Sequence, residues 1–157
     1  MRITLLTMGK TDVAWVRQGL DLYISRLSHY IPFSLKEIPE LKNASSLSRD
    51  QIREKEGELL MAQTRPSDEV ILMDEHGKEY RSVEFAAFIE KKLATSSRDI
   101  VFVIGGAYGF SEDVYRRADG KISLSKMTFS HQMVRTIFAE QLYRAFTIIK
   151  GEPYHHE

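Results

Sequence analysis

Three glycines break an apolar run in FVIGGAYGF, residues 102–110. The run predicts a buried strand that stops at Gly105-Gly106, and Gly109 follows within a turn. A glycine pair at a strand end indicates either a tight turn that needs positive φ or a close approach of another molecule to the backbone. The second interpretation favours a flat, uncharged ligand such as an adenine ring, which backbone groups can bind between apolar side chains.

The C-terminal stretch GEPYHHE gathers reactive side chains at residues 151–157. His155 and His156 are adjacent, and neighbouring side chains point apart, so the pair is a poor metal-binding motif and we expect no metal. Two interpretations of this tail stay open. It is either a solvated terminus or a segment that works at an active site, since it holds a tyrosine and two imidazoles.

Several familiar sites are excluded by the residue types. The chain has no cysteine, which excludes disulfides, thiolate catalysis and cysteine-bound zinc. The dinucleotide motif G-x-G-x-x-G and the phosphate-binding loop G-x-x-x-x-G-K-[ST] are both absent. Ser130 and His131 are adjacent at a predicted helix start, where serine is most often a cap, so they do not indicate a Ser/His/Asp arrangement.

The elements that must position these residues alternate along the chain. Strands are predicted at 2–9, 32–39, 68–74, 99–106 and 121–125, and helices at 11–30 (capped by Thr11 or Asp12), 48–64, 82–97, 111–119 and 130–151. This alternation predicts an α/β fold with a mostly parallel, Rossmann-like sheet and helices on both faces. Ligands bind such sheets outside the carboxyl ends of the strands, which is where the glycine loop lies.

The predicted last helix is apolar around most of its circumference. Its apolar positions include Val134, Phe138 and Leu142. Such a helix has to be covered on several sides, so we expect its own domain to cover one side and a second copy, in a homodimer, to cover another. We expect a polar strip of Arg135, Glu140 and Arg144, the last two forming an i,i+4 ion pair.

Length and charge narrow the class of protein. At 157 residues the chain is most simply one domain, 1–157. Its 22 Lys and Arg balance 22 Asp and Glu, so the net charge is zero and does not by itself favour binding to nucleic acid. No apolar run approaches the roughly 20 residues that span a bilayer. We therefore expect a cytoplasmic protein with no membrane attachment.

Four stretches together resemble one family. ILMDEHGK, FVIGGAYGF, ISLSKMTFSHQMVRTIFAEQLYRAFTI and the terminal PYHHE are similar to the knotted SPOUT-class methyltransferases, and more closely to the bacterial ribosomal RNA large subunit methyltransferase H family. The resemblance runs essentially end to end. It implies a homodimer that moves a methyl group from S-adenosylmethionine to N3 of a pseudouridine in 23S rRNA, on the assembled ribosome. It also implies a trefoil knot, in a region of about 100–151, which is an exception to the rule that chains do not thread loops.

The resemblance also implies which residues bind the cofactor. They are Met73, Gly105, Leu124, Ser125, Lys126, Met127, Thr128 and Phe129. Two positions depart from the family pattern: relatives often have leucine where this chain has Met73, and a lysine or arginine where it has His156. If that family cation touches RNA phosphate, His156 makes a weaker or pH-dependent contact.

The chemistry requires that N3 of pseudouridine lose a proton before it attacks the sulfonium methyl. Tyr154 or His155 is a candidate base, and solvent is the alternative once N3 is positioned. We expect the tail to fold over a donor pocket, its own or that of the other subunit. Arg135, beside the cofactor loop, is expected to clamp a phosphate or carboxylate.

Two other classes of function stay open from the residues. A nucleotide-dependent oxidoreductase would require the G-x-G-x-x-G turn that is absent. A non-catalytic ribosome-associated factor that kept the fold would have no cofactor affinity, which the intact glycine loop disfavours.

Overall fold

The computed structural model describes residues 1–156, and its centre is a five-stranded sheet. The strands are β1 (Ile3–Met8), β2 (Phe33–Ile38), β3 (Glu69–Glu79), β4 (Ile100–Ile104) and β5 (Gly120–Ser123). They lie in the order β2-β1-β4-β3-β5, and every neighbouring pair is parallel. Because all five strands run in the same direction, their carboxyl ends lie at one edge of the sheet.

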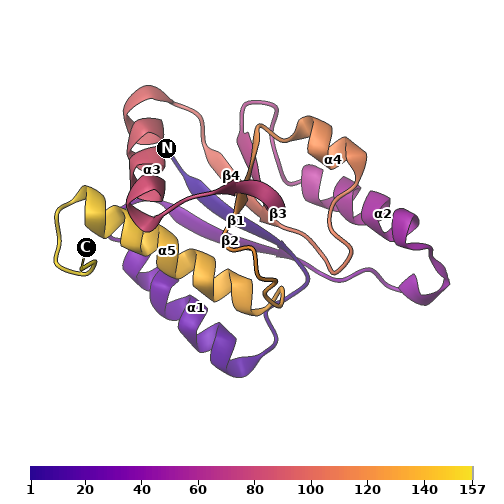
Figure 1. Ribbon diagram of the computed structural model, residues 1–157. Helices are drawn as coiled ribbons and strands as arrows, with labels where there is room; N and C mark the ends of the chain where they lie inside the picture. The colour runs from indigo at the N-terminus through magenta and orange to yellow at the C-terminus, as the bar shows by residue number, and fades with distance from the viewer. Residues whose placement is uncertain (157) are drawn as a thin grey trace.

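Helices cover both faces of the sheet, as the alternating pattern predicts (Figure 1). Those on one face are α1 (Ala14–Leu27), α3 (Ser82–Thr95) and α5 (Met133–Ile149), and those on the other are α2 (Arg49–Met61) and α4 (Glu112–Arg117). A short 3-10 turn, 44–46, precedes α2. The α/β fold is therefore confirmed, and its sheet is entirely parallel.

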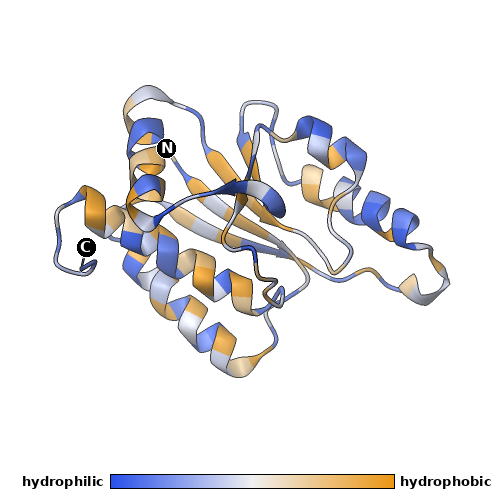
Figure 2. Ribbon diagram, in the orientation of Figure 1, coloured by the Kyte–Doolittle hydropathy of each residue, from blue (hydrophilic) through white to orange (hydrophobic). Residues whose placement is uncertain are grey.

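Two apolar clusters lie on opposite faces of the sheet. Phe102 and Ile104 of β4 point toward α5, where Phe138 and Leu142 are buried. Val101 and Val103 point the other way, toward α2 and α4. The strands are accordingly apolar on both faces, and Figure 2 shows them mostly orange between helices with blue outer surfaces. Burial on both sides is typical of parallel sheets.

Capping residues explain where two of the helices begin. Ser48 caps α2 in a reciprocal capping box with Gln51, and Ser111 caps α4 by accepting the Val114 N–H. The prediction that Thr11 or Asp12 caps α1 is wrong, because α1 begins after Val13 without a side-chain cap. Thr11 is buried instead, and its backbone N–H donates to Glu37 Oε2 at 2.6 Å.

The strand β3 is longer than predicted, since it runs through the EHG segment to Glu79 rather than ending at residue 74. Both Met73 and Lys78 pair with Ile122 of β5, so the residues between them form an irregularity in the ladder. Gly77 lies directly on the β5 backbone: a Cβ there would stand 2.6 Å from the Ile122 nitrogen. In Figure 1 the end of β3 crosses in front of the chain that leaves β5. The trefoil knot itself stays a prediction.

Candidate functional site

A pocket lies at the carboxyl ends of β3, β4 and β5, where the fold places ligands. It encloses about 680 Å³ when its open mouth is included. We call it the donor pocket. It is lined by Met73, Asp74, Glu75, Ile104, Gly105, Gly106, Gly109, Phe110, Ile122, Ser123, Leu124, Ser125, Met127, Thr128, Phe129, His131 and Val134.

Most of the predicted cofactor residues lie in this wall. They are Met73, Gly105, Leu124, Ser125, Met127, Thr128 and Phe129; the remaining one, Lys126, is not among the lining residues. Residues separated by some 50 positions therefore meet in one pocket, although their role in cofactor binding stays a prediction. Sequence reasoning missed Phe110, Ile122 and Val134, because an apolar side chain gives no signal of its own that it reaches a ligand.

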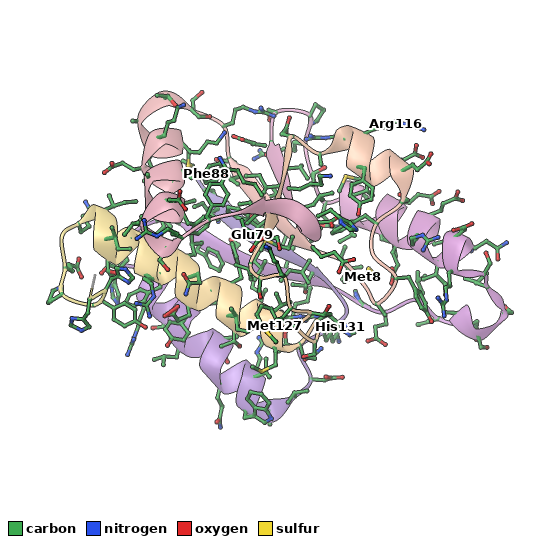
Figure 3. All side chains as sticks on the ribbon, in the orientation of Figure 1. Met8, Glu79, Phe88, Arg116, Met127 and His131 are labelled. Carbon is green, nitrogen blue, oxygen red and sulfur yellow. The ribbon has the colours of Figure 1, made fainter. Side chains whose placement is uncertain are left out.

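The loop from 124 to 132 forms the outer wall and is fixed by its own hydroxyls. Ser123 Oγ donates to the Ser125 carbonyl at 2.9 Å, and the Met127 N–H donates to Ser125 Oγ at 3.0 Å. This turn leaves Met127 78% exposed at the pocket mouth. Figure 3 shows Met127 and His131 near the start of α5. An apolar side chain held so far out of the protein is available to cover a bound ligand.

The glycines of the loop after β4 serve two different purposes. Only Gly109 has a positive φ, at +80°, so the tight-turn explanation holds there and not for the pair Gly105-Gly106. A Cβ on Gly105 would lie 2.9 Å from the Phe110 ring, and one on Gly106 would lie 2.5 Å from Glu56 Oε2. The pair is therefore small because side chains of this same chain already press against both glycines.

Asp74 stands at the rim of the donor pocket and is held in place by two donors. The Tyr115 hydroxyl donates to Asp74 Oδ2, and the His76 N–H donates to Oδ1 at 2.8 Å. Burial, together with this hydrogen bond, raises the pKa of Tyr115 above its ordinary value, so the hydroxyl stays a donor. Asp74 consequently keeps an acceptor pointed along the pocket rim, where hydroxyl groups of a ligand can bind.

Arg135 lies inside the protein and not on a polar strip of α5, so that prediction is wrong. Its side chain is fully buried, with Nη2 donating to the Met8 carbonyl at 3.0 Å and Nη1 to the Gly9 carbonyl at 2.9 Å. Further bonds reach Thr11 Oγ1 and the His131 carbonyl, each at 2.8 Å. Arg135 thus ties the start of α5 to the loop after β1, and nothing in these contacts presents it to a phosphate.

Replacing Arg135 should destabilise the protein more than any surface charge does. Arg135→Ala removes the arginine donor from the Met8 and Gly9 carbonyls and one charged partner from Glu37, and we expect the free energy of unfolding to fall by about 3 kcal/mol. Arg116→Ala is the control, because Arg116 is exposed and pairs only with Glu112 and Asp113 of its own helix. Urea titration measures both. Equal urea midpoints for the two variants would contradict the role of Arg135 in joining the start of α5 to the loop after β1.

The C-terminal tail folds back onto α5 of its own chain. The Tyr154 hydroxyl donates to Glu140 Oε1 at 3.2 Å, and Arg144 Nη1 lies 3.0 Å from His155 Nδ1. The predicted Glu140–Arg144 ion pair is present, and it supports both tail residues. No tail residue that the structure describes lines the donor pocket, and Figure 1 places the tail at the opposite end of α5. The prediction that the tail covers its own pocket is therefore wrong for this conformation.

The contacts of the tail show how both predicted bases are engaged. Burial, then hydrogen bonding with Tyr23 and the charge of Glu140, raise the pKa of Tyr154, so its hydroxyl keeps its proton. Arginine only donates, so Nδ1 of His155 accepts from Arg144 and a neutral ring carries its proton on Nε2. In this arrangement the Tyr154 proton is used in the bond to Glu140 and His155 Nδ1 is used in the bond to Arg144, so neither atom is placed to act as a base.

Neither a metal centre nor a membrane span is built from the described residues. Within 1–156, no group of three or more His, Asp or Glu is arranged to hold a metal ion. Over the same range no helix has the length and apolarity needed to cross a bilayer.

The sheet is parallel, and its last strands and their loops enclose an apolar pocket that is rimmed by glycines. These features define a class of α/β proteins that bind nucleotide-like ligands. Comparison with known proteins identifies the family. A family model described as predicted SPOUT methyltransferase matches residues 1–155. The chain is 54% identical to ribosomal RNA large subunit methyltransferase H of Parabacteroides distasonis and 55% identical to that of Bacteroides thetaiotaomicron, covering 100% of each chain and of this one.

The same-named protein of Christiangramia forsetii is 54% identical over 99% of both chains. The chain therefore belongs to the SPOUT methyltransferases, and within them to the ribosomal RNA large subunit methyltransferase H family. Among solved structures, the SpoU methyltransferase AviRb from Streptomyces viridochromogenes, in complex with AdoMet, aligns with a TM-score of 0.45 and 13% identity. That alignment covers 95% of this chain and 58% of the other, and is too distant to support a conclusion.

Proposed function

We propose that this protein transfers a methyl group from S-adenosylmethionine to N3 of a pseudouridine in 23S rRNA, on the assembled ribosome and in the cytoplasm. The single observation that carries the proposal is the donor pocket, in which apolar side chains from three strand ends surround a glycine-lined floor. Its full-length relatives are named for methylation of large-subunit ribosomal RNA.

The residues of the donor pocket fit an adenosyl ligand. Ile104, Leu124 and Val134 provide apolar surface on which a flat ring can lie, and Gly105 and Gly106 contribute to the wall with no side chain of their own. Asp74 offers an acceptor for ribose hydroxyls. When bound, S-adenosylmethionine supplies a methyl group already activated by its sulfonium charge, so the chemistry calls for no metal ion.

A homodimer is part of the same proposal. Within one chain the tail is at the far end of α5 from the donor pocket, so Tyr154 and His155 meet a pocket only if it belongs to a second copy. Several large apolar side chains stay partly exposed around α1, α5 and the pocket mouth, including Trp15 at 62%. We infer that the partner covers this surface and that Tyr154 and His155 position the target base.

Titration calorimetry tests the cofactor half of the proposal. We expect S-adenosylhomocysteine to bind and NADH not to bind, because the pocket has no dinucleotide turn. Wild-type protein should then methylate ribosomes that lack the modification, with mass spectrometry of the digested RNA locating the methyl group. Binding of NADH instead would indicate an oxidoreductase, and failure to bind S-adenosylhomocysteine would indicate the non-catalytic ribosome-associated factor.

A further inference from the structure

One buried polar atom in the described part of the chain has no hydrogen-bond partner, and it is Oε1 of Glu56. A buried carboxylate oxygen without a donor costs free energy, so such an atom in a folded protein requires an explanation. A ligand that brings its own donor is one. No feature of the sequence marks Glu56, because it lies in a helix of mostly charged residues.

The position of Glu56 is fixed by close packing on both sides. Gly57 lies so near α4 that a Cβ there would be 2.8 Å from Ser111 Oγ and from Val114. Glu56 itself presses on the glycine loop, since a Cβ on Gly106 would lie 2.5 Å from Oε2 and 2.7 Å from Oε1. The carboxylate is thus held against the backbone of a residue that also lines the donor pocket.

A second pocket opens beside this carboxylate and encloses about 890 Å³, including its mouth. Its walls include the apolar Met8 and Ile52, the ring of Tyr108, and the carboxylates of Glu40 and Glu56. It shares Gly106 and His131 with the donor pocket, so contents of the two pockets are neighbours. Met8 and His131 are both labelled in Figure 3.

The chemistry of the second pocket fits a nucleobase better than a phosphate. No lysine or arginine is among its lining residues, whereas phosphate binding relies on such cations. An unstacked RNA base needs a flat surface and hydrogen-bond partners along its edge. Tyr108 offers one face of its ring, since the Arg49 guanidinium lies 5.0 Å from the ring centroid over the other. A uracil-type ring carries N–H donors on that edge, and the orphan oxygen of Glu56 is an acceptor.

We propose that the second pocket receives the target base and that Glu56 is the general base for its methylation. The ring N–H bond breaks as its proton moves to Glu56 Oε1, and the freed electron pair of nitrogen bonds to the methyl carbon. The electrons of the sulfur–methyl bond pass to sulfur, leaving S-adenosylhomocysteine. This inference rests on the proposed function.

The surroundings of Glu56 suit this role. Burial, and next the charge of Glu40, raise its pKa above the ordinary value for a glutamate, which brings it closer to the pH at which a general base works best. The groups that face it are Glu40 from the segment after β2, Tyr108 from the glycine loop and His131 from the loop before α5. None of them is a fixed cation. The Tyr154 hydroxyl already donates to Glu140 and His155 Nδ1 already accepts from Arg144, so neither of these atoms is placed to take the proton of the base.

Glu56→Gln tests the proposal because it keeps the shape of the side chain and cannot take up the proton. We expect kcat on ribosomes that lack the modification to fall by about 100-fold or more, while S-adenosylhomocysteine affinity stays within about twofold. Above the raised pKa of Glu56 the wild-type protein holds an unpaired buried charge. The melting temperature of the variant at pH 8 should therefore equal or exceed that of the wild type. Glu58→Gln is the matched control, because Glu58 is an exposed neighbour on α2. It should leave kcat, S-adenosylhomocysteine affinity and the melting temperature unchanged.

The pH profile provides a second measurement that a structural role would not move. Wild-type kcat should fall as the pH drops through the pKa of Glu56, because the carboxylate becomes protonated. Glu40→Gln removes the neighbouring charge that raises this pKa, so the fall should shift to lower pH. Glu56→Asp, which withdraws the carboxylate by one methylene, is the second variant if Gln does not fold, and it should lose part of the activity.

Two results would overturn this inference without overturning the proposed function. One is a Glu56→Gln variant whose kcat stays within threefold of the wild-type value. The other is a Glu56→Gln variant in which turnover and melting temperature fall together. Wild-type protein that methylates no ribosomal RNA would overturn the proposed function and this inference with it.

Discussion

Deletion of residues 153–157 should abolish methyl transfer while S-adenosylhomocysteine still binds. The donor pocket contains no described residue of the tail, so calorimetry on the shortened chain should give the wild-type affinity. Tyr154 and His155 are held by Glu140 and Arg144 on the surface of α5, so the fold does not depend on them. Single-turnover methylation of ribosomes measures the chemical step. Unchanged turnover would contradict the functional role of the tail.

Mixed dimers distinguish a tail that acts in its partner from one that acts in its own chain. A chain shortened before Pro153 keeps its donor pocket, and a Gly105→Trp chain keeps its tail but fills its pocket. Each is expected to be inactive alone. In a random mixture, about half the dimers join one chain of each kind, and each of these has one complete site in two, so about a quarter of the wild-type turnover should return. No recovery would indicate that pocket and tail belong to the same chain.

Gly77→Ala should prevent stable folding. A methyl group at this position would lie 2.6 Å from the nitrogen and the carbonyl carbon of Ile122 and 2.7 Å from the carbonyl carbon of Lys121. These are backbone atoms of a paired strand, so no rotamer change can relieve the clash, and the expected loss is about 3 kcal/mol or more. A typical domain is stable by only about 5–15 kcal/mol, so a large part of the protein would unfold or aggregate.

Gly120→Ala is the matched control for this substitution. Gly120 lies on β5, a neighbour of the same ladder, and a Cβ there would meet nothing within 4 Å. Circular dichroism during thermal unfolding should show a nearly unchanged midpoint for Gly120→Ala and a greatly lowered one for Gly77→Ala. Similar midpoints would mean that β3 and β5 can move apart, and that the close contact between them is not essential.

The fold could be predicted from local patterns because each strand is a short apolar run and each helix has a periodic face. The same patterns predicted the loops that form the donor pocket, since strand ends meet at one edge whatever their order. Strand boundaries were less predictable. The extension of β3 through His76 and Gly77 depends on pairing with β5, some 45 residues later in the chain, and no local pattern encodes that pairing.

Charged residues were the main source of error. The sequence predicts that Arg135 and Glu56 are both exposed to solvent, because a charged residue in a helix usually lies on the surface of the protein. Their burial depends on what packs against the helix from distant parts of the chain, such as the loop after β1 for Arg135 and the glycine loop for Glu56. The tail could not be placed either, because its position depends on Glu140 and Arg144 and, in our proposal, on a second copy.

The position of β5 also bears on how the protein is made. Half of the donor pocket comes from β5 and the loop that follows it, and this loop is joined to the segment after β1 by Gln132, which donates to the Lys10 carbonyl, and by Arg135 at the start of α5. A chain still emerging from its own ribosome has its earlier strands but no site. In our proposal, cofactor binding is therefore acquired only after β5 and the loop that follows it have been synthesised, and products terminated before β5 would neither consume the methyl donor nor compete for it.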